Sequence, residues 1–453
     1  MKRLQTYCTI ILITFASCNS NQQTTIESSE DKQVAFPERA ASMNIYEVNI
    51  RQYTPEGTFN AFSDHLSRLK KMGVDILWIM PIHPIGKEKR KGGLGSPYSI
   101  QDYAAVNPDF GALEDFKNLV NKAHDLDMLV ILDWVANHTS WDHKWISESP
   151  DFYTLDSLGN MQAPVADWSD VADLNYDNVK MQEAMISDMK FWIDNADIDG
   201  FRCDVAGFVP MTFWNKAKNA LDEVKDVFML AEWDDPKMHD TAFHMSYGWT
   251  FHHVLNEVAK GNQNADSVAS FLTKDLEKFG PEAYRMNFTS NHDENSWNGT
   301  VKERMGDASQ ALAVLASTVQ GMPLIYSGME AGLDKRLSFF EKDSIDWSNL
   351  KLEKFYTQLL KLKHDNEAIW NGSFGGVPQR INEGANVFAF KRVKNGNTVI
   401  GIFNLSDENQ KLIINDESVL GSYSDYFTNN KHTLSADGPL ELTAWKYLIF
   451  TKK

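Results

Sequence analysis

Cysteine is scarce in this chain, which has three among 453 residues. Cys8 and Cys18 lie near the N-terminus, and Cys203 stands alone in the segment GFRCDVA. A framework of intramolecular disulfides is therefore not expected. Along a strand, Cys203 points away from the side that Arg202 and Asp204 share, so we expect it to be a small buried apolar residue.

Clusters of histidine and cysteine are absent as well, which excludes a transition-metal centre built from these ligands. Basic residues are fewer than acidic ones: the chain has 44 Lys and Arg and 62 Asp and Glu, which gives a formal net charge of −18. That charge argues against nucleic acid or an anionic membrane surface as a partner. A neutral polysaccharide is not repelled, and the 13 Trp and 14 Tyr include rings of the kind that stack on sugars.

The apolar stretch near the N-terminus, Thr9 to Ala16, is too short for a stable transmembrane helix. It follows a basic start and leads into Phe15-Ala16-Ser17-Cys18, which resembles a lipoprotein processing site with Phe15 in place of the usual Leu. We therefore expect residues 1–17 to be a signal peptide and Cys18 to carry lipid. This predicts a membrane anchor in a bacterial cell envelope, at the periplasmic face or the cell surface. Ordinary secretion with cleavage nearby is the alternative.

Between residues 41 and 368, apolar strand-like runs alternate with amphipathic helical stretches, such as the one at residues 59–72. Alternating β and α segments with apolar strands predict a parallel sheet, and eight such units predict a (β/α)8 TIM barrel, an α/β fold. The predicted strands lie in MNIYEVNIRQY, VDILWIM, MLVILDW, IDGFRCDV, VFMLAEW, AFHMSY, AYRMNFTSN and MPLIYSG.

Three regions depart from the barrel pattern. Residues 18–40 are predicted to be a tether, because most of them are Asn, Gln, Ser, Thr or acidic. Residues 138–177, after the third strand, exceed a barrel loop and contain no long helical pattern, which indicates a small irregular domain. Residues 374–453 consist of short alternating strands separated by Gly, Asn and Asp turns, which predicts a C-terminal antiparallel β domain of the β-sandwich kind.

Four acidic residues each follow an apolar strand-like run: Asp133, Asp204, Glu232 and Asp293. Because the carboxyl ends of the strands of a barrel meet at one rim, we expect these side chains to converge there, partly desolvated. Such a group of carboxylates suits acid/base and nucleophilic chemistry on a glycosidic bond. A set of structural ion pairs is the competing interpretation, since these also bury acids.

The segments around these acids, DWVANH, GFRCDVA, LAEW and SNHDEN, resemble the conserved regions of the α-amylase superfamily (glycoside hydrolase family 13), in the same order. VADLN, at residues 171–175, resembles the short motif between the first and second regions. The resemblance implies a catalytic barrel, a domain B at residues 138–177 and a C-terminal domain. It also implies a retaining hydrolase of α-glucosidic bonds in starch-type glucans or maltooligosaccharides.

The resemblance assigns a role to each acid: Asp204 is the nucleophile, Glu232 the general acid/base, and Asp293 the stabiliser of the transition state. Spacing places Arg202 on the same side of the strand as Asp204, where a guanidinium keeps a carboxylate ionised. The apolar run before Glu232 raises a carboxyl pKa. The alternatives are a purely structural Arg–Asp pair and a helix cap. Asp133 is expected to support the arginine.

Other positions match residues that hold ligands in the family. Tyr98 corresponds to an aromatic residue that stacks on the sugar at the cleavage site, and His138 and His292 to histidines that bind it. Asn137 and Asp173 match positions that hold a structural Ca²⁺ in many amylases, and oxygen ligands suit Ca²⁺. Several members of the family that cleave short substrates lack this ion, so both possibilities stay open.

The sequence departs from the family after the nucleophile. Gly207 and Phe208 stand where typical endo-acting α-amylases have Lys-His, and Val205 resembles members that act on α-1,6 bonds. The preferred linkage, endo or exo action, and hydrolysis or transfer therefore stay open. A transglycosylase or isomerase, or a non-catalytic glucan-binding member, are the alternative functions. Further candidate sugar contacts, each as easily a core residue, are Trp168, Trp233 and Trp297.

Overall fold

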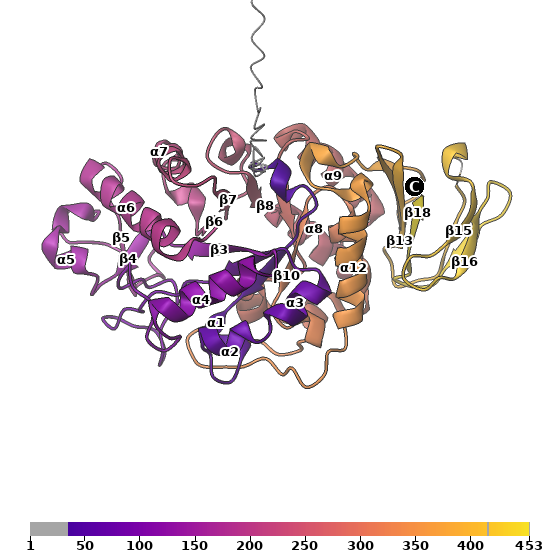
Figure 1. Cartoon of the computed structure of the whole chain (residues 1–453). Coiled ribbons are helices and arrows are strands. Elements are labelled where there is room, and N and C mark those ends of the chain that lie inside the picture. The colour runs from indigo at the N-terminus through magenta and orange to yellow at the C-terminus, as the bar shows by residue number, and fades with distance from the viewer. Residues whose placement is uncertain (1–34, 415, 453) are drawn as a thin grey trace, which may run out of the picture. The chain divides into compact units, whose positions relative to one another are not determined.

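The structure is a computed structural model that describes residues 35–414 and 416–452 (Figure 1). The predictions of a signal peptide and of a lipid on Cys18 lie outside the described residues. No helix within the described ranges is long and apolar enough to cross a membrane.

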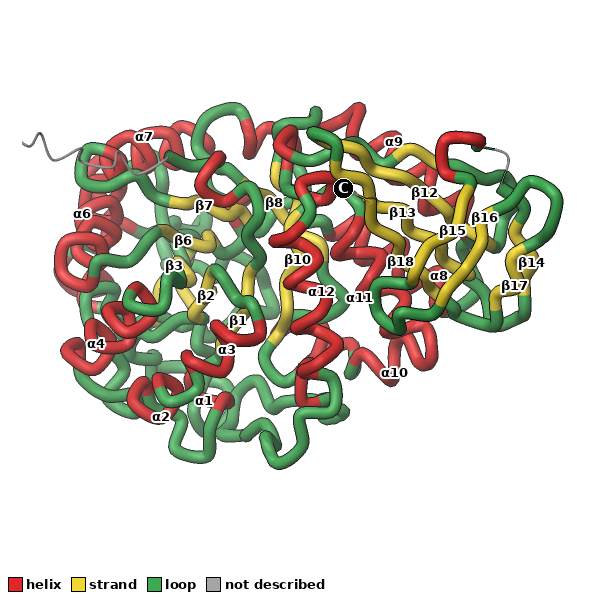
Figure 2. Tube along the Cα trace, turned by 45° about the vertical axis from the view of Figure 1, so that its right-hand side comes forward, coloured by secondary structure: helices red, strands yellow, loops and turns green. Residues whose placement is uncertain are grey.

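Eight parallel strands close into a barrel in the order β1-β10-β9-β8-β7-β6-β3-β2 (Figure 2). Every predicted barrel strand is present, so the predicted fold class is confirmed. The strands are β1 Ile45–Val48, β2 Ile76–Ile79, β3 Leu129–Trp134, β6 Gly200–Cys203, β7 Phe228–Ala231, β8 Met245–Tyr247, β9 Tyr284–Asn287 and β10 Met322–Tyr326.

The strands are apolar because both of their faces are covered. On β2, Ile76 and Trp78 join the cluster that fills the barrel, whereas Leu77 and Ile79 join the larger cluster that packs under the helices. This alternation follows from the period of two residues in a strand. Cys203 is buried in the outer cluster, as predicted.

Helices surround the barrel (Figure 1). The longer ones are α4 Leu113–His124, α6 Val179–Ala196, α7 Met211–Asp222, α8 Trp249–Ala259, α9 Ala265–Phe279, α11 Ser309–Thr318 and α12 Glu353–Asp365. The single helix predicted at residues 59–72 is wrong. Two helices, α2 Phe59–Ser63 and α3 Leu66–Met72, replace it, because the His65 N–H bonds the Phe62 carbonyl in a tighter i→i+3 turn.

Both ends of the first strand segment differ from the prediction. The strand stops at Val48, and a short helix α1, Ile50–Tyr53, replaces its second half.

Before the strand, the ring of Phe36 packs 5.3 Å from that of Phe228, and the backbone N–H of Phe36 donates to Asp226 at 2.8 Å. Because the Phe36 ring covers the amino end of β7, the chain belongs to the packed fold from Phe36 onward. The prediction that the tether extends to residue 40 is therefore wrong.

Between β3 and β6 the chain leaves the barrel. Strands β4 (His138–Ser140) and β5 (Val171–Asp173) pair there in antiparallel fashion. The α-helix in this excursion, α5 (Lys144–Glu148), has only five residues. The excursion thus lacks a long helix, as expected.

The C-terminal region forms antiparallel sheets. One has the order β11-β12-β13-β18, and two further pairs are β14-β17 and β15-β16. The short antiparallel strands predicted for residues 374–453 are thus present. The bounds are β11 Gln379–Arg380, β12 Val387–Lys394, β13 Asn397–Asn404, β14 Gln410–Leu412, β15 Gly421–Ser424, β16 Lys431–Leu434, β17 Leu440–Leu442 and β18 Tyr447–Lys452.

A buried arginine joins these sheets to the barrel. Arg392, on β12, donates to the carbonyls of Thr318 and Val319 at the end of α11, at 3.0 and 2.7 Å. It also donates to the carbonyls of Gly376 and Trp370. Burial lowers its pKa to about 9. The carbonyls at a helix C-terminus lack intrahelical partners, so this guanidinium satisfies them and fixes β12 against α11.

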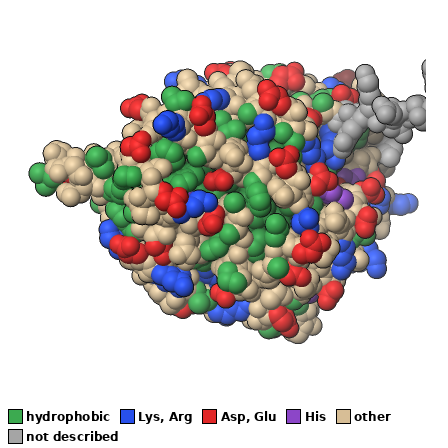
Figure 3. Space-filling model, turned by 60° about the vertical axis from the view of Figure 1, so that its left-hand side comes forward, with side chains coloured by type: hydrophobic (Ala, Val, Ile, Leu, Met, Phe, Trp, Pro, Cys, Tyr) green, Lys and Arg blue, Asp and Glu red, His purple; other side chains and the backbone are tan. Residues whose placement is uncertain are grey.

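Charge is dispersed over the face of the molecule that Figure 3 shows. Acidic and basic side chains lie between hydrophobic ones there. The net negative charge is therefore not gathered into one patch on that face.

Candidate active site

A cleft of about 540 Å³ opens at the carboxyl ends of the barrel strands. Residues from β3, β6, β7 and β9, or from the loops after them, line it together, as the strand-end pattern predicts. The predicted site residues that the cleft brings together are Tyr98, His138, Asp204, Glu232, His292 and Asp293.

One fully buried guanidinium connects three strand ends. Arg202 Nη1 lies 2.8 Å from Asp133 Oδ1 and 3.0 Å from Asp204 Oδ1, and Nη2 lies 2.8 Å from Glu232 Oε2. Its Nε donates to the Tyr247 hydroxyl at 3.1 Å. Arg202 therefore lies below the cleft and orients the two carboxylates assigned to catalysis.

Asp133 supports the arginine, as expected. It has no exposed surface, and its Oδ2 accepts hydrogen bonds from Trp78 Nε1 at 3.0 Å and from the Tyr98 hydroxyl at 3.1 Å. With both oxygens engaged, Asp133 is not available to a substrate.

Burial raises the pKa of both Asp204 and Glu232. The charge of Glu232 raises the pKa of Asp204 further, while Arg202 opposes the shift at both carboxyls. We therefore expect the pair to hold a proton near neutral pH. Nη1 of Arg202 makes an aligned hydrogen bond to Asp204, whereas the contact of Nη2 with Glu232 lacks that alignment.

A strained turn holds Glu232. Val205, directly after the nucleophile candidate, has φ 36° and ψ 48°, a left-handed conformation that is costly for a β-branched residue. The turn aims the Val205 N–H at Glu232 Oε2, 2.8 Å away. Glu232 is not a helix cap, because Asp235 caps the following 3₁₀ turn through the Lys237 N–H.

His292 is held as a cation. Its Nδ1 lies 2.5 Å from Glu47 Oε1, and its Nε2 lies 2.9 Å from the Tyr98 hydroxyl, which donates to Asp133 and so accepts from His292. Both ring nitrogens therefore carry protons. Burial lowers the pKa of His292, but the carboxylates of Asp293 and Glu47 outweigh burial and raise it to about 9.

Sequence analysis missed Glu47, although this residue too is an acid in an apolar strand-like run. Glu47 is a carboxylate within the buried strand β1 and has no exposed surface. It lies inside the apolar run instead of at its end, so the pattern of strand-end acids did not include it. Phe339 and Phe340, from the segment after β10, also line the cleft and have no local sequence signal.

The remaining predicted sugar contacts differ in exposure. Asp293 is 34% exposed, and its Oδ2 lies 3.4 Å from His292 Nε2. His138 is buried, its pKa is lowered by that burial to about 4, and its ring lies 5.6 Å from that of Trp168. Trp168 and Trp297 line the cleft, whereas Trp233 packs behind it.

Asn137 and Asp173 do not by themselves fit a calcium site. Asp173 pairs with His138 across β4 and β5, and Asn137 Nδ2 lies 3.2 Å from His138 Nδ1. In the part of the chain that the structure describes, no group of three or more His, Cys, Asp or Glu side chains can hold a metal ion. A structural Ca²⁺ stays a prediction, which the melting temperature with and without a chelator tests.

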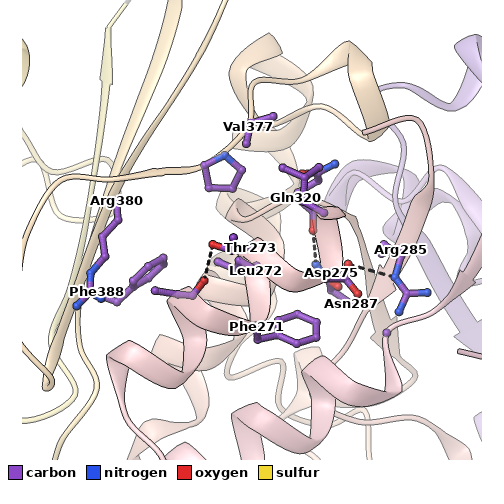
Figure 4. Close-up of a pocket in the computed structure, with 14 residues that line it drawn as sticks. Phe271, Leu272, Thr273, Asp275, Arg285, Asn287, Gln320, Val377, Arg380 and Phe388 are labelled. Carbon is purple, nitrogen blue, oxygen red and sulfur yellow. Dashed lines mark hydrogen bonds and ion pairs between the residues drawn. The ribbon is translucent and has the colours of Figure 1, made fainter. Parts of the chain in front are cut away.

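A second, smaller cavity lies between α9, β9 and β12 (Figure 4). Its volume is about 160 Å³. Arg285 pairs there with Asp275 at 3.3 Å and, beyond the cavity, with Asp234 at 2.6 Å, while Asn287 donates to the Gln320 carbonyl. The polar groups Arg285, Asp275 and Asn287 are therefore already paired with protein partners in this cavity.

Comparisons with known proteins agree with this geometry. The family model "Alpha amylase, catalytic domain" matches residues 15–169 and 165–373. The alpha-amylase MalA of Haloarcula japonica is 26% identical over 392 residues, which are 82% of this chain and 56% of that protein, so the chain spans little more than half of this relative.

Two further comparisons bear on the fold and on the reaction class. The solved maltogenic alpha-amylase AmyB from Thermotoga neapolitana is 28% identical, with a TM-score of 0.83 over 91% of this chain and 98% of that one. An alpha-1,4-glucan:maltose-1-phosphate maltosyltransferase of Corynebacterium glutamicum is 32% identical over 236 residues, 46% of this chain and 35% of that protein.

We expect His292 to stay protonated at neutral pH and to titrate near its pKa of about 9. Its pKa is raised above the usual 6.5, so its contribution to stability is complete below about 6.5 and is lost as the pH rises through about 9. The ¹⁵N shifts of the ring over pH 5–10 measure this. The exposed His253 is the internal control, and Glu47→Gln should lower the midpoint. A midpoint near 6.5 for His292 would contradict the assignment.

Proposed function

Because the chain belongs to the α-amylase catalytic-domain family, we propose that it is a retaining glycoside hydrolase of α-glucosidic bonds in starch-type glucans or maltooligosaccharides. The observation that carries the proposal is the buried Arg202, which holds Asp204 and Glu232 at one cleft at the carboxyl ends of the strands.

In the first step Asp204 attacks the anomeric carbon while Glu232 protonates the leaving glycosidic oxygen, which gives a glycosyl ester on Asp204. In the second step Glu232 takes a proton from water, which attacks the same carbon and releases Asp204. The raised pKa of Glu232 supports its role as the acid. The free oxygens of this pair, Asp204 Oδ2 and Glu232 Oε1, have no protein partner among the described residues.

The other residues of the cleft suit a sugar at the cleavage position. His292 is a cationic donor, and the half-exposed Asp293 beside it is an acceptor for sugar hydroxyls. Tyr98 presents an aromatic ring fixed by its hydroxyl. A non-catalytic glucan-binding role is disfavoured, because a protein that only binds has no need of a complete pair of acids on one guanidinium.

Transfer to a sugar acceptor is the second candidate function. It uses the same ester on Asp204, and the similarity to a maltosyltransferase favours keeping it. An isomerase would use the same ester on Asp204. It differs from a transferase only in that the released sugar stays in the cleft and serves as the acceptor.

Substitution of the two carboxylates tests the mechanism. Asp204→Asn should abolish turnover of maltoheptaose, keep the fold, and lower the melting temperature, because Arg202 loses one of its buried carboxylates. Glu232→Gln should lose roughly 10²–10⁴-fold on maltoheptaose and recover on maltosyl fluoride, whose leaving group needs no proton. Asp235→Asn, which keeps a helix-capping side chain, is the matched control. Full activity of Asp204→Asn would rule out its role as nucleophile.

We also propose that Cys18 carries lipid and anchors the protein to a bacterial cell envelope, with secretion as the alternative. The sequence Phe15-Ala16-Ser17-Cys18 supports this. Cys18→Ser should move the protein from the membrane fraction to the soluble fraction, whereas the control Cys203→Ala should leave it membrane-bound. Labelled palmitate should enter the wild type and Cys203→Ala but not Cys18→Ser. A Cys18→Ser protein that sediments with membranes would contradict the anchor.

A further inference from the structure

The carboxylate of Asp293 is anchored less firmly than the other two acids of the cleft. Asp204 and Glu232 both contact the buried guanidinium of Arg202. The side chain of Asp293 is 34% exposed, and its one hydrogen-bond or ion-pair partner in the described part of the chain is His292 Nε2, 3.4 Å away. The place of Asp293 in the cleft is therefore set chiefly by its backbone.

The backbone after Asp293 forms an unusual turn. Residues Glu294–Asn298 make a single π-helical turn, which closes with a hydrogen bond of 2.9 Å from the Gly299 N–H to the Glu294 carbonyl. The Glu294 N–H donates to Asn291 Oδ1 at 2.8 Å. Turns of this kind are rare and frequently lie at functional sites. Because this turn begins directly after Asp293, the contacts that hold the turn also hold Asp293.

The side chain of Glu294 is held between two bases from neighbouring helices. Its Oε2 lies 3.1 Å from His252 Nε2, on α8, and 3.6 Å from Arg304 Nη1, on α10 (Val301–Met305). Burial raises the pKa of Glu294, but the hydrogen bond and charge of His252 and the charge of Arg304 outweigh burial and lower it. Glu294 is thus an ionised carboxylate, 12% exposed, and we call Glu294, His252 and Arg304 the clamp.

The His252 ring joins the clamp to the end of β9. Its Nδ1 lies 3.1 Å from the Phe288 carbonyl, which can only accept, so Nδ1 carries a proton. Its Nε2 lies 2.9 Å from Asn256 Nδ2 and 3.1 Å from Glu294 Oε2. A neutral ring accepts from the amide, whereas a ring with a second proton donates to Glu294. Arg304, which is always charged, is therefore the constant cation of the clamp.

Arg304 connects the two ends of the segment that carries Asp293. Its Nη2 donates to the carbonyl of Thr289, just after β9, at 2.6 Å. Its Nε donates to the carbonyl of Gly299, at the end of the π-helical turn, at 3.0 Å. The clamp therefore ties the turn to the strand end, and the barrel fixes that strand end.

We propose that Glu294 is a positioning residue, which fixes through the clamp the backbone from which Asp293 meets the sugar. The proposal rests on the proposed function, in which Asp293 accepts hydrogen bonds from sugar hydroxyls. Arg202 orients the carboxylates of Asp204 and Glu232 by direct contact, whereas the clamp acts on Asp293 through the chain. A displacement of about 1 Å at such a group can cost about 100-fold in rate.

Glu294→Gln tests the proposal, because the amide keeps the size of the side chain and removes its charge. With maltosyl fluoride as substrate, kcat should fall roughly tenfold to hundredfold, while KM should stay within about threefold. The melting temperature shows that the variant is folded. Glu257→Gln, which removes a carboxylate paired with Lys260 on the same helix α8, is the matched control and should retain kcat.

A double-mutant cycle separates positioning from a general effect on stability. Glu294→Gln should change fluoride release by less than about twofold in an Asp293→Asn protein, which has no carboxylate left to misplace. If Asp293→Asn releases too little fluoride to compare, the four proteins are compared by their Kd for isofagomine, a ring with a cationic nitrogen in place of the anomeric carbon. The loss of affinity caused by Glu294→Gln should likewise disappear in the Asp293→Asn protein.

Two results would overturn the proposal. One is an unchanged kcat in a folded Glu294→Gln protein. The other is an equal loss with and without the Asp293 carboxylate, which is the behaviour of a residue that only stabilises the fold. No fluoride release by the wild type would instead contradict the proposed function.

Discussion

The buried charge of Arg202 is the constraint on which the rest of the site depends. A guanidinium without exposed surface costs several kcal/mol of desolvation unless carboxylates and hydrogen bonds surround it. Here Asp133, Asp204 and Glu232 surround it from three different strands, and Tyr247 supplies a fourth contact. The same pairing that compensates the charge links the carboxyl ends of β3, β6 and β7 at the cleft.

The balance of charge around Arg202 then sets the protonation of the cleft. Carboxyl groups outnumber cations there, so burial favours the neutral form of some of them, while the neighbouring carboxylates favour the cationic form of His292 against the effect of burial. Asp204 accepts an aligned hydrogen bond from Arg202, whereas Glu232 accepts one from the Val205 N–H. The proposed nucleophile and the proposed acid therefore differ in their hydrogen-bond donors as well as in residue type.

The sequence predicted the parts of this arrangement that repeat along the chain. Apolar runs that end on Asp204 or Glu232 indicate both the strands and the carboxyl end of the barrel. They do so because the alternation and the apolar character of a strand can be seen in a short stretch of sequence. The pairing of Glu47 with His292 joins residues 245 positions apart, and no local pattern encodes it. The packing of Phe36 on Phe228 is likewise decided by a tertiary contact, which overrides local propensity.

The residues after Asp204 pack closely on the residue after Glu232. A Cβ at Gly207 would lie 2.0 Å from Trp233 Cε2, and the ring of Phe208 lies 5.6 Å from that of Trp233. A sequence can show that Gly207 and Phe208 depart from the family pattern, but only the structure shows that Trp233 occupies the vacated space.

The most direct test of the account is to trap the glycosyl ester with a maltosyl fluoride that carries fluorine in place of the 2-hydroxyl of the reacting sugar. The account predicts that the mass of the protein rises by one maltosyl unit and that peptide mapping places the label on Asp204. A label on Asp293, or complete turnover with inversion at the anomeric carbon, would contradict it.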